Sequence, residues 1–256
     1  MNPPNPPAAS MPFGEHLEEL RSRLFVIVLT TGAVFALCMF FYRDLWQLAM
    51  FPRERAARWL GGTAAELFPL QFMRPTEGLS SAFDLALKIA VGLTLPIILT
   101  QLWLFVAPGL TPREKRAVKW TAVAGSGLFL LGAALAFLYA APLGLSWLAH
   151  FDRTLSATVT QWRVDAYLDF IFMACLGFGL GFELPLAMAA LAWTGLLPPE
   201  KIGRYWRQTL FALLIVAALF TPPDPYTMLL LATCLTALYG AGYWLARLVY
   251  KSRVES

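Results

Sequence analysis

The chain has 256 residues, of which 58% are hydrophobic and 14% are charged, and its net charge is +4. Soluble domains are typically about 45–50% apolar and about 25% charged. A water-exposed surface needs more charges than this chain carries, and its apolar surface is too abundant for a disordered chain. The composition therefore excludes an ordinary soluble enzyme and predicts an all-α integral membrane protein.

Six stretches are long and apolar enough to cross a bilayer, or nearly so, because a helix needs about 20 apolar residues to span the ~30 Å hydrocarbon layer. We predict a single transmembrane domain at 12–246, between a disordered proline-rich tail at 1–11 and a cytoplasmic tail at 247–256. The first tail lacks the basic segment of a secretory signal, so the first span is expected to stay uncleaved. The expected spans are 24–41, 85–106, 120–141, 170–191, 209–220 and 228–244.

Basic residues predict the orientation of these spans. Six crossings put both termini on one side of the membrane, and that side carries twelve lysines and arginines against seven on the other. Cytoplasmic loops are enriched in these residues. Both termini are therefore expected in the cytoplasm.

The fifth span and the outer segments are unusual in length. As a helix, residues 209–220 rise only about 18 Å, which indicates either local thinning of the bilayer or shielding within the bundle. The outer segments 42–80 and 143–169 contain recurring aromatic residues, which are typical of short helices at the membrane interface. We expect them to cap the outer face of a concave bundle.

No sequence pattern points to catalysis. The chain has no G-x-x-x-x-G-K-[ST] motif and no H-E-x-x-H motif, and His16 and His150 fall on opposite sides of the predicted membrane. Ser126 lies between two glycines, but no span contains a histidine base, so helix packing explains it better than an intramembrane hydrolase does. We predict no catalytic residue, no cofactor and no metal ligand.

Acidic residues mark two places on the predicted cytoplasmic side. Residues 13–24 combine an apolar stripe, spaced by four, three and four residues, with acids on the other faces. This pattern predicts an amphipathic helix on the membrane surface that leads into the first span, in which Glu19 can pair with Arg23. The loop 107–119 has one acid, Glu114, among four bases, and a local ion pair is its simplest interpretation.

Glu183 lies inside a predicted span, where an acid is costly. It is the fourteenth of the 22 residues of the fourth span, and a charge near the bilayer centre costs about 2.5–3.5 kcal/mol. Gly177, Gly179 and Gly181 allow a neighbouring helix to approach closely, and Pro185 frees a backbone carbonyl. Two interpretations stay open, a functional carboxylate and a protonated one that joins two helices.

Five short motifs follow one another between residues 16 and 224 on this six-span topology, and the resemblance that they carry covers residues 12–253. They are HLEELR at 16–21, LP at 95–96 with QLWLFVAPGL at 101–110, EKR at 114–116, FELP at 182–185 and TPPD at 221–224. This series resembles the TatC family, the multispanning subunit of the twin-arginine protein translocase.

The resemblance implies a receptor for folded proteins that carry twin-arginine signal peptides. In the family, one cytoplasmic acid before the first span and another in the first cytoplasmic loop receive the paired arginines. Glu19 and Glu114 match these positions, with Arg21 and Phe105 beside them. Acids suit the recognition of arginine, because a planar guanidinium can donate two parallel hydrogen bonds to a carboxylate and lysine cannot.

The resemblance also implies partners and a location. The expected partners are twin-arginine signal peptides, single-span TatA- and TatB-type proteins, further copies of the chain and the lipid bilayer, without nucleic acid. The resemblance further implies export driven by the proton-motive force, in the inner (cytoplasmic) membrane of a prokaryote, and the lack of a nucleotide-binding motif agrees with an energy source other than ATP. The residues implied in partner binding or transport are Pro52, Pro96, Glu183, Thr221, Asp224 and Met228.

Three positions depart from the family pattern. Asp84 stands where relatives commonly have lysine, and its spacing predicts a pair with Lys88. Phe137 replaces a tyrosine, and Met228 replaces a glutamine of a polar patch that docks the single-span partners. The alternative function is a proton-coupled small-solute transporter with Glu183 as its proton carrier. That alternative requires a water-lined cavity at the midplane and paired broken helices in two related halves.

Overall fold

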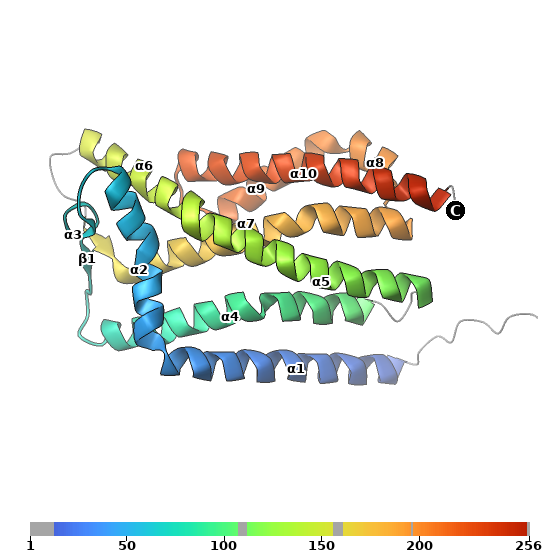
Figure 1. Ribbon diagram of the computed structural model, residues 1–256, viewed down its shortest axis with the longest axis horizontal. Coiled ribbons are helices and arrows are strands. Elements are labelled where there is room, and N and C mark those ends of the chain that lie inside the picture. Colours follow the sequence, from blue (N-terminus) through green and yellow to red (C-terminus); the bar gives the residue numbers. More distant parts are fainter. Residues whose placement is uncertain (1–12, 107–111, 156–160, 196, 255–256) are drawn as a thin grey trace, which may run out of the picture.

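The computed structural model describes residues 13–106, 112–155, 161–195 and 197–254. Most of these residues are helical, and the long helices run side by side in one bundle (Figure 1). Five helical segments are long and apolar enough to cross a membrane, and a shorter apolar helix of 15 residues accompanies them. Over the described ranges the chain is therefore an all-α, polytopic membrane protein.

The long helices extend past the apolar stretches that predict them, because polar turns continue the backbone hydrogen bonding at their ends. The long helices are α1 (Phe13–Phe40), α4 (Glu77–Val106), α5 (Pro112–Leu135), α7 (Val164–Thr194) and α10 (Pro225–Val254). The shorter helices are α2 (Tyr42–Trp59), α3 (Ala64–Leu67), α6 (Ala141–Leu155), α8 (Pro199–Arg204) and α9 (Trp206–Phe220).

The two ends of the bundle differ in construction. At one end, here the terminal end, α1 and α5 begin and α4, α7 and α10 finish (Figure 1). At the other, the cap end, α2 lies across the long helices and α3 lies at their far edge (Figure 1). There β1 (Leu70–Gln71) pairs in parallel with β2 (Trp162–Arg163). The two outer segments are thus joined to each other, a link that their aromatic composition does not predict.

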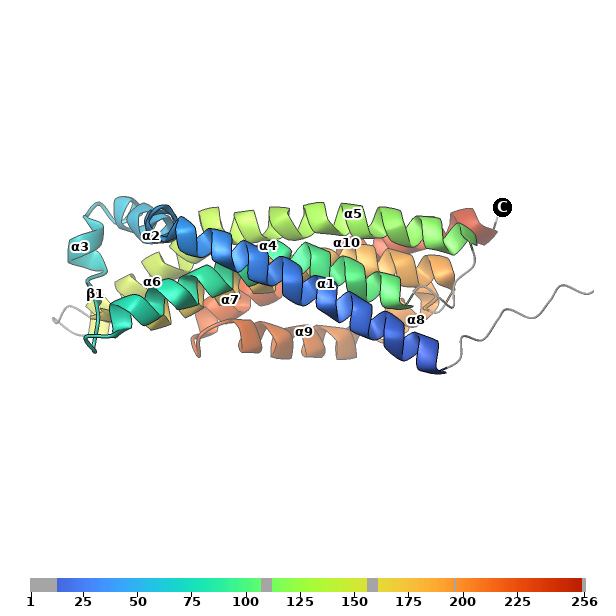
Figure 2. The same cartoon turned by 90° about the horizontal axis from the view of Figure 1, so that it is seen from below.

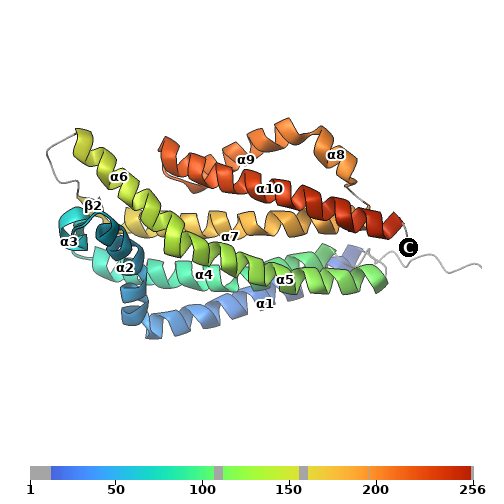
Figure 3. The ribbon, with the colours of Figure 1, turned by 45° about the horizontal axis from the view of Figure 1, so that its top comes forward.

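Residues 143–155 do not form a separate interfacial helix, and that expectation is wrong. They belong to α6, which continues the line of α5 (Figure 3). A π-helical turn at Ala136–Ala140 ends two residues before Pro142. Proline cannot donate the regular α-helical hydrogen bond, and the wider turn before it lets the helix run on past this position.

The turn between α9 and α10 is recessed from the cap end of the bundle (Figures 1 and 3). The 15 residues of α9 rise roughly 22 Å, still short of the hydrocarbon layer. Just after the turn, the ring of Tyr226 stacks on that of Trp147 in α6, with 4.7 Å between centroids. This contact favours shielding of the short hairpin by the bundle over thinning of the bilayer alone.

Glycines let α7 pack closely against its neighbours. A Cβ on Gly132 of α5 would lie 2.6 Å from the backbone oxygen of Phe178 in α7. A Cβ on Gly177 would meet the Cβ of Phe220 in α9 at 2.9 Å. By contrast, α1 crosses α4 at the outside of the bundle (Figure 2), and its Phe25 is 67% exposed. The core therefore centres on α7, and much of α1 faces outward.

Candidate functional site at the terminal end

The helix ends that carry the expected signal-peptide residues all lie at the terminal end (Figure 1). Glu19 and Arg21 lie near the start of α1, Phe105 in the last turn of α4, and Glu114 in the first turn of α5. Helix α4 packs against both α1 and α5. The side chains of Phe105 and Glu114 are outside the part of the chain that the structure describes.

Glu19 is held by an arginine of its own helix. The Nε of Arg23 donates to Oε1 of Glu19 at 3.1 Å, and Nη2 of the same guanidinium donates to the same oxygen. The Nη1 of Arg23 also donates to Oε1 of Gln101 in α4, at 3.2 Å. The Glu19–Arg23 pair is the one that the spacing predicts, whereas Gln101 was missed because only the fold brings α4 beside α1.

This ion pair is partly shielded from water. The side chains of Arg23 and Glu19 are 20% and 23% exposed, whereas the neighbouring Arg21 is exposed. Attraction between opposite charges is stronger where water is partly excluded. The carboxylate of Glu19 is therefore a better cation-binding group than its place on an amphipathic surface helix indicates.

Glu183 lies against the backbone of α5. A Cβ on Gly125 would be 2.6 Å from one carboxylate oxygen of Glu183 and 2.9 Å from the other. Glu183 is half-buried, and within the described residues no group donates a hydrogen bond to it. The interpretation that this acid joins two helices by a hydrogen bond therefore gains no support from the described side chains.

Asp224 and Thr221 have structural partners within the outer turn. Asp224 accepts a hydrogen bond from the backbone N–H of Thr227 at 2.8 Å and another from the Thr227 hydroxyl. This is the arrangement of a helix N-cap, at the start of α10. The Thr221 hydroxyl donates to the Ala217 carbonyl at 2.9 Å. Met228 is half-buried and packs against an apolar cluster formed by α7, α9, α10 and the π-helical turn.

Both expected prolines are buried inside helices. Pro52 lies within α2 and is among the most completely buried side chains. Pro96 lies within α4, and its carbonyl accepts a hydrogen bond from the Thr100 hydroxyl at 2.8 Å. A proline inside a helix removes one backbone hydrogen bond, so these two positions shape α2 and α4.

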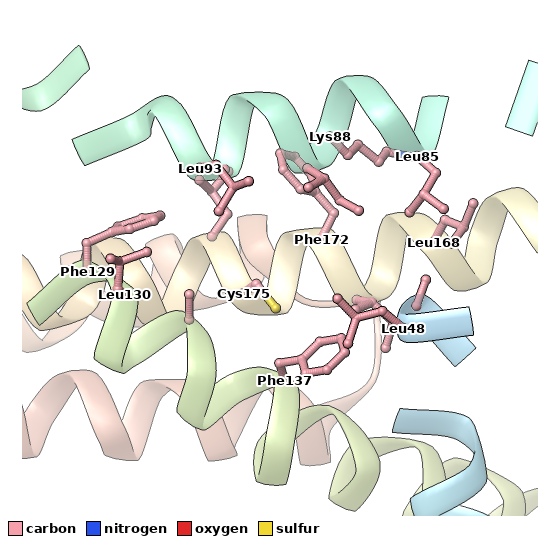
Figure 4. Close-up of a pocket in the computed structure, with 16 residues that line it drawn as sticks. Leu48, Leu85, Lys88, Leu93, Phe129, Leu130, Phe137, Leu168, Phe172 and Cys175 are labelled. Atoms are coloured by element: carbon pink, nitrogen blue, oxygen red, sulfur yellow. The ribbon is translucent and has the colours of Figure 1, made fainter. Parts of the chain in front are cut away.

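An apolar cavity of about 230 Å³ lies between α2, α4, α5 and α7 (Figure 4). Phe129, Phe137 and Phe172 line it, and Lys88 is its charged member. Lys88 also lines a second, polar cavity of about 460 Å³ toward the cap end. The first cavity is apolar, so it is not the water-lined cavity that a proton-coupled transporter needs.

Lys88 pairs with two carboxylates where the two cavities meet. It binds Asp84 on its own helix, as the spacing predicts, and Asp169 of α7 at 2.6 Å. Asp169 was missed because it lies at the end of an outer segment, far from Lys88 in sequence. The pair with Asp169 ties α4 to α7.

These features define a class, a polytopic helical membrane protein with acidic residues near one end of its bundle and a half-buried acid within a long apolar helix. Comparison with known proteins identifies the family. The model of the family described as Sec-independent protein translocase protein (TatC) matches residues 15–233. The chain belongs to the TatC family, and this membership supersedes the transporter alternative.

Individual relatives agree with this assignment. The Sec-independent protein translocase protein TatC of Helicobacter pylori strain J99 is 33% identical over 234 residues, covering 91% of this chain and 88% of the relative. The TatC protein of Escherichia coli K12 is 29% identical, covering 93% and 89%. A crystal structure of the twin-arginine translocase receptor TatC superposes with a TM-score of 0.77 at 27% identity, covering 91% of this chain and 99% of the other.

Proposed function

We propose that this chain is the receptor and assembly core of a twin-arginine translocase in the inner membrane of a prokaryote. It binds the paired arginines of a signal peptide at the terminal end and recruits single-span TatA- or TatB-type proteins. The proton-motive force then drives export of the folded cargo. Membership of the TatC family carries the proposal, and the start of both the Glu19-bearing and the Glu114-bearing helix at the same end of the bundle supports the choice of site (Figure 1).

Two carboxylates on different helices suit two adjacent guanidinium groups. Arginine keeps its charge at any physiological pH and presents a planar fork of donors, so one carboxylate can hold it in a fixed orientation. A hydrogen bond to a charged group is worth about 1.5–3 kcal/mol before solvent exposure is discounted. Glu19 is only partly exposed, which limits that discount. In this arrangement Arg21 and Phe105 lie beside the bound peptide.

Glu183 is the proposed contact for a polar residue of a single-span partner. Its carboxylate lies within a span, is half-buried and accepts no hydrogen bond from a described residue. A polar group on a partner helix could donate a hydrogen bond to this carboxylate inside the bilayer, where polar groups on neighbouring helices bond to one another because water is absent. The remaining proposed partner or transport positions are Pro52, Pro96, Thr221, Asp224 and Met228.

A titration with two peptides tests the receptor function. Labelled signal peptides with Arg-Arg and with Lys-Lys are titrated against the wild type and the Glu19→Ala and Glu114→Ala variants. We expect the wild type to prefer Arg-Arg and each variant to lose affinity by about tenfold or more, as the loss of a charged hydrogen bond implies. Equal binding of both peptides to all three proteins would reject the proposed site.

A further inference from the structure

Arg23 presents to Glu19 the same chemical group that a cargo arginine would present. Its Nε and Nη2 both donate to one oxygen of the Glu19 carboxylate, and the resulting ion pair is partly buried. The carboxylate proposed to read an incoming arginine is therefore already bound to a guanidinium before any peptide arrives.

Arg23 also has a second acceptor within reach. Its Nη1 donates to Gln101 of α4, so the guanidinium lies between α1 and α4 and bonds to both. Releasing Glu19 would leave Arg23 with one hydrogen-bond partner in place. Gln101 lies four residues before Phe105, and residues so spaced lie on the same helix face. Once displaced from Glu19, Arg23 would stay bound to Gln101, next to the proposed peptide site.

We propose that Arg23 is a resident competitor for Glu19, which a cargo arginine displaces when it binds; the inference rests on the proposed function above. The exchange replaces one guanidinium by another on the same carboxylate, so the number of charged hydrogen bonds to Glu19 is conserved. A cargo lysine would replace a fork of two donors by a single ammonium, and would leave this site less well satisfied.

The competition sets how tightly any cation binds at Glu19. Every peptide must displace the same guanidinium, so the apparent affinities for Arg-Arg and Lys-Lys peptides fall by one common factor. Helical and partly exposed ion pairs are worth about 0.2–1 kcal/mol, which makes this factor about threefold. Arg23 thereby lowers the affinity for every peptide by the same factor and leaves the ratio between the Arg-Arg and Lys-Lys affinities unchanged.

The test uses Arg23→Gln with a matched control, Arg204→Gln. Arg204 is an exposed arginine of α8 at the same end of the bundle, so its loss lowers the local positive charge equally. Arg-Arg and Lys-Lys peptides are titrated against each full-length variant in nanodiscs, by fluorescence anisotropy. We expect Arg23→Gln to bind both peptides about threefold more tightly, with an unchanged ratio between them, and Arg204→Gln to bind as the wild type does.

Three results would overturn the proposal. Weaker Arg-Arg binding by Arg23→Gln would mean that Arg23 only supports Glu19. An equal gain for Arg204→Gln would mean that general charge accounts for the effect, and unchanged binding by Arg23→Gln would mean that no competition exists. A Glu19→Gln single variant separates this inference from the proposed function. If the Glu19→Gln protein binds the Arg-Arg peptide as the wild type does, the proposed site is wrong. If it binds the peptide more weakly, the double variant Glu19→Gln/Arg23→Gln should bind the peptide with the same affinity as Glu19→Gln alone.

Discussion

Lys88 of α4 binds Asp169 of α7, with 2.6 Å between Nζ and Oδ1, while it also pairs with Asp84 on its own helix. The Lys88 side chain is only 14% exposed. Removing the cation would leave two carboxylates facing each other at the edge of the bundle. We therefore regard this lysine as the link that joins α4 to α7 near the cap end.

The first prediction concerns that link. Lys88→Met should lower the free energy of unfolding by about 1 kcal/mol, since both acids are partly exposed and water screens their repulsion. Thermal unfolding in detergent measures the loss. Lys201→Met, at an exposed position of α8, is the matched control and should unfold as the wild type does. Adding Asp169→Asn to Lys88→Met should restore part of the stability, and no restoration would contradict the pairing.

The second prediction concerns helix packing. Gly132→Ala would place a Cβ 2.6 Å from a backbone oxygen of α7, which cannot turn aside as a side chain can. We expect a loss of about 1–3 kcal/mol, typical of overpacking. Gly127→Ala, on the same helix, meets no described atom within 4 Å and should be neutral. Equal thermal stability of the two variants would show that α5 and α7 do not pack as described.

The third prediction concerns Asp224. This residue caps the start of α10, and we also propose that it acts in partner binding or transport. Asp224→Ala should lower the free energy of unfolding by about 1 kcal/mol, and Asp224→Asn should not, because an amide oxygen also caps. Because the Asp224→Asn variant keeps its stability, any loss of export by this variant reports the role of the negative charge of Asp224. If Asp224→Asn unfolds as readily as Asp224→Ala, the cap is not what stabilises the turn.

The fourth prediction concerns Glu183. Glu183→Ala should reduce co-purification of a single-span partner by about tenfold, as the loss of one hydrogen bond to a charged group implies. Signal-peptide binding should persist, because this residue lies within the spans and away from the terminal end. Glu183→Gln keeps hydrogen-bonding atoms and should retain part of the recruitment. Unchanged recruitment by Glu183→Ala would reject the proposed contact.

Local spacing and composition predict part of this molecule well. Apolar stretches must be helical to satisfy their backbone in lipid, so the all-α membrane fold follows from composition. The pairs Glu19–Arg23 and Asp84–Lys88 follow from four-residue spacing, because such residues are neighbours on a helix. These features depend on residues close together in sequence.

Contacts between distant segments could not be predicted in this way. The bond from Arg23 to Gln101 and the ion pair from Lys88 to Asp169 exist because α4 packs beside α1 and α7. No periodicity encodes these arrangements, since each results from tertiary packing.

The central claim is that Glu19 and Glu114 each hold one arginine of the signal peptide. A double-mutant cycle tests it directly: each peptide arginine is changed to lysine in turn, against the wild type, Glu19→Gln and Glu114→Gln. We predict a coupling energy of about 1 kcal/mol or more between each acid and a different arginine. Effects that simply add for every combination would contradict the claim.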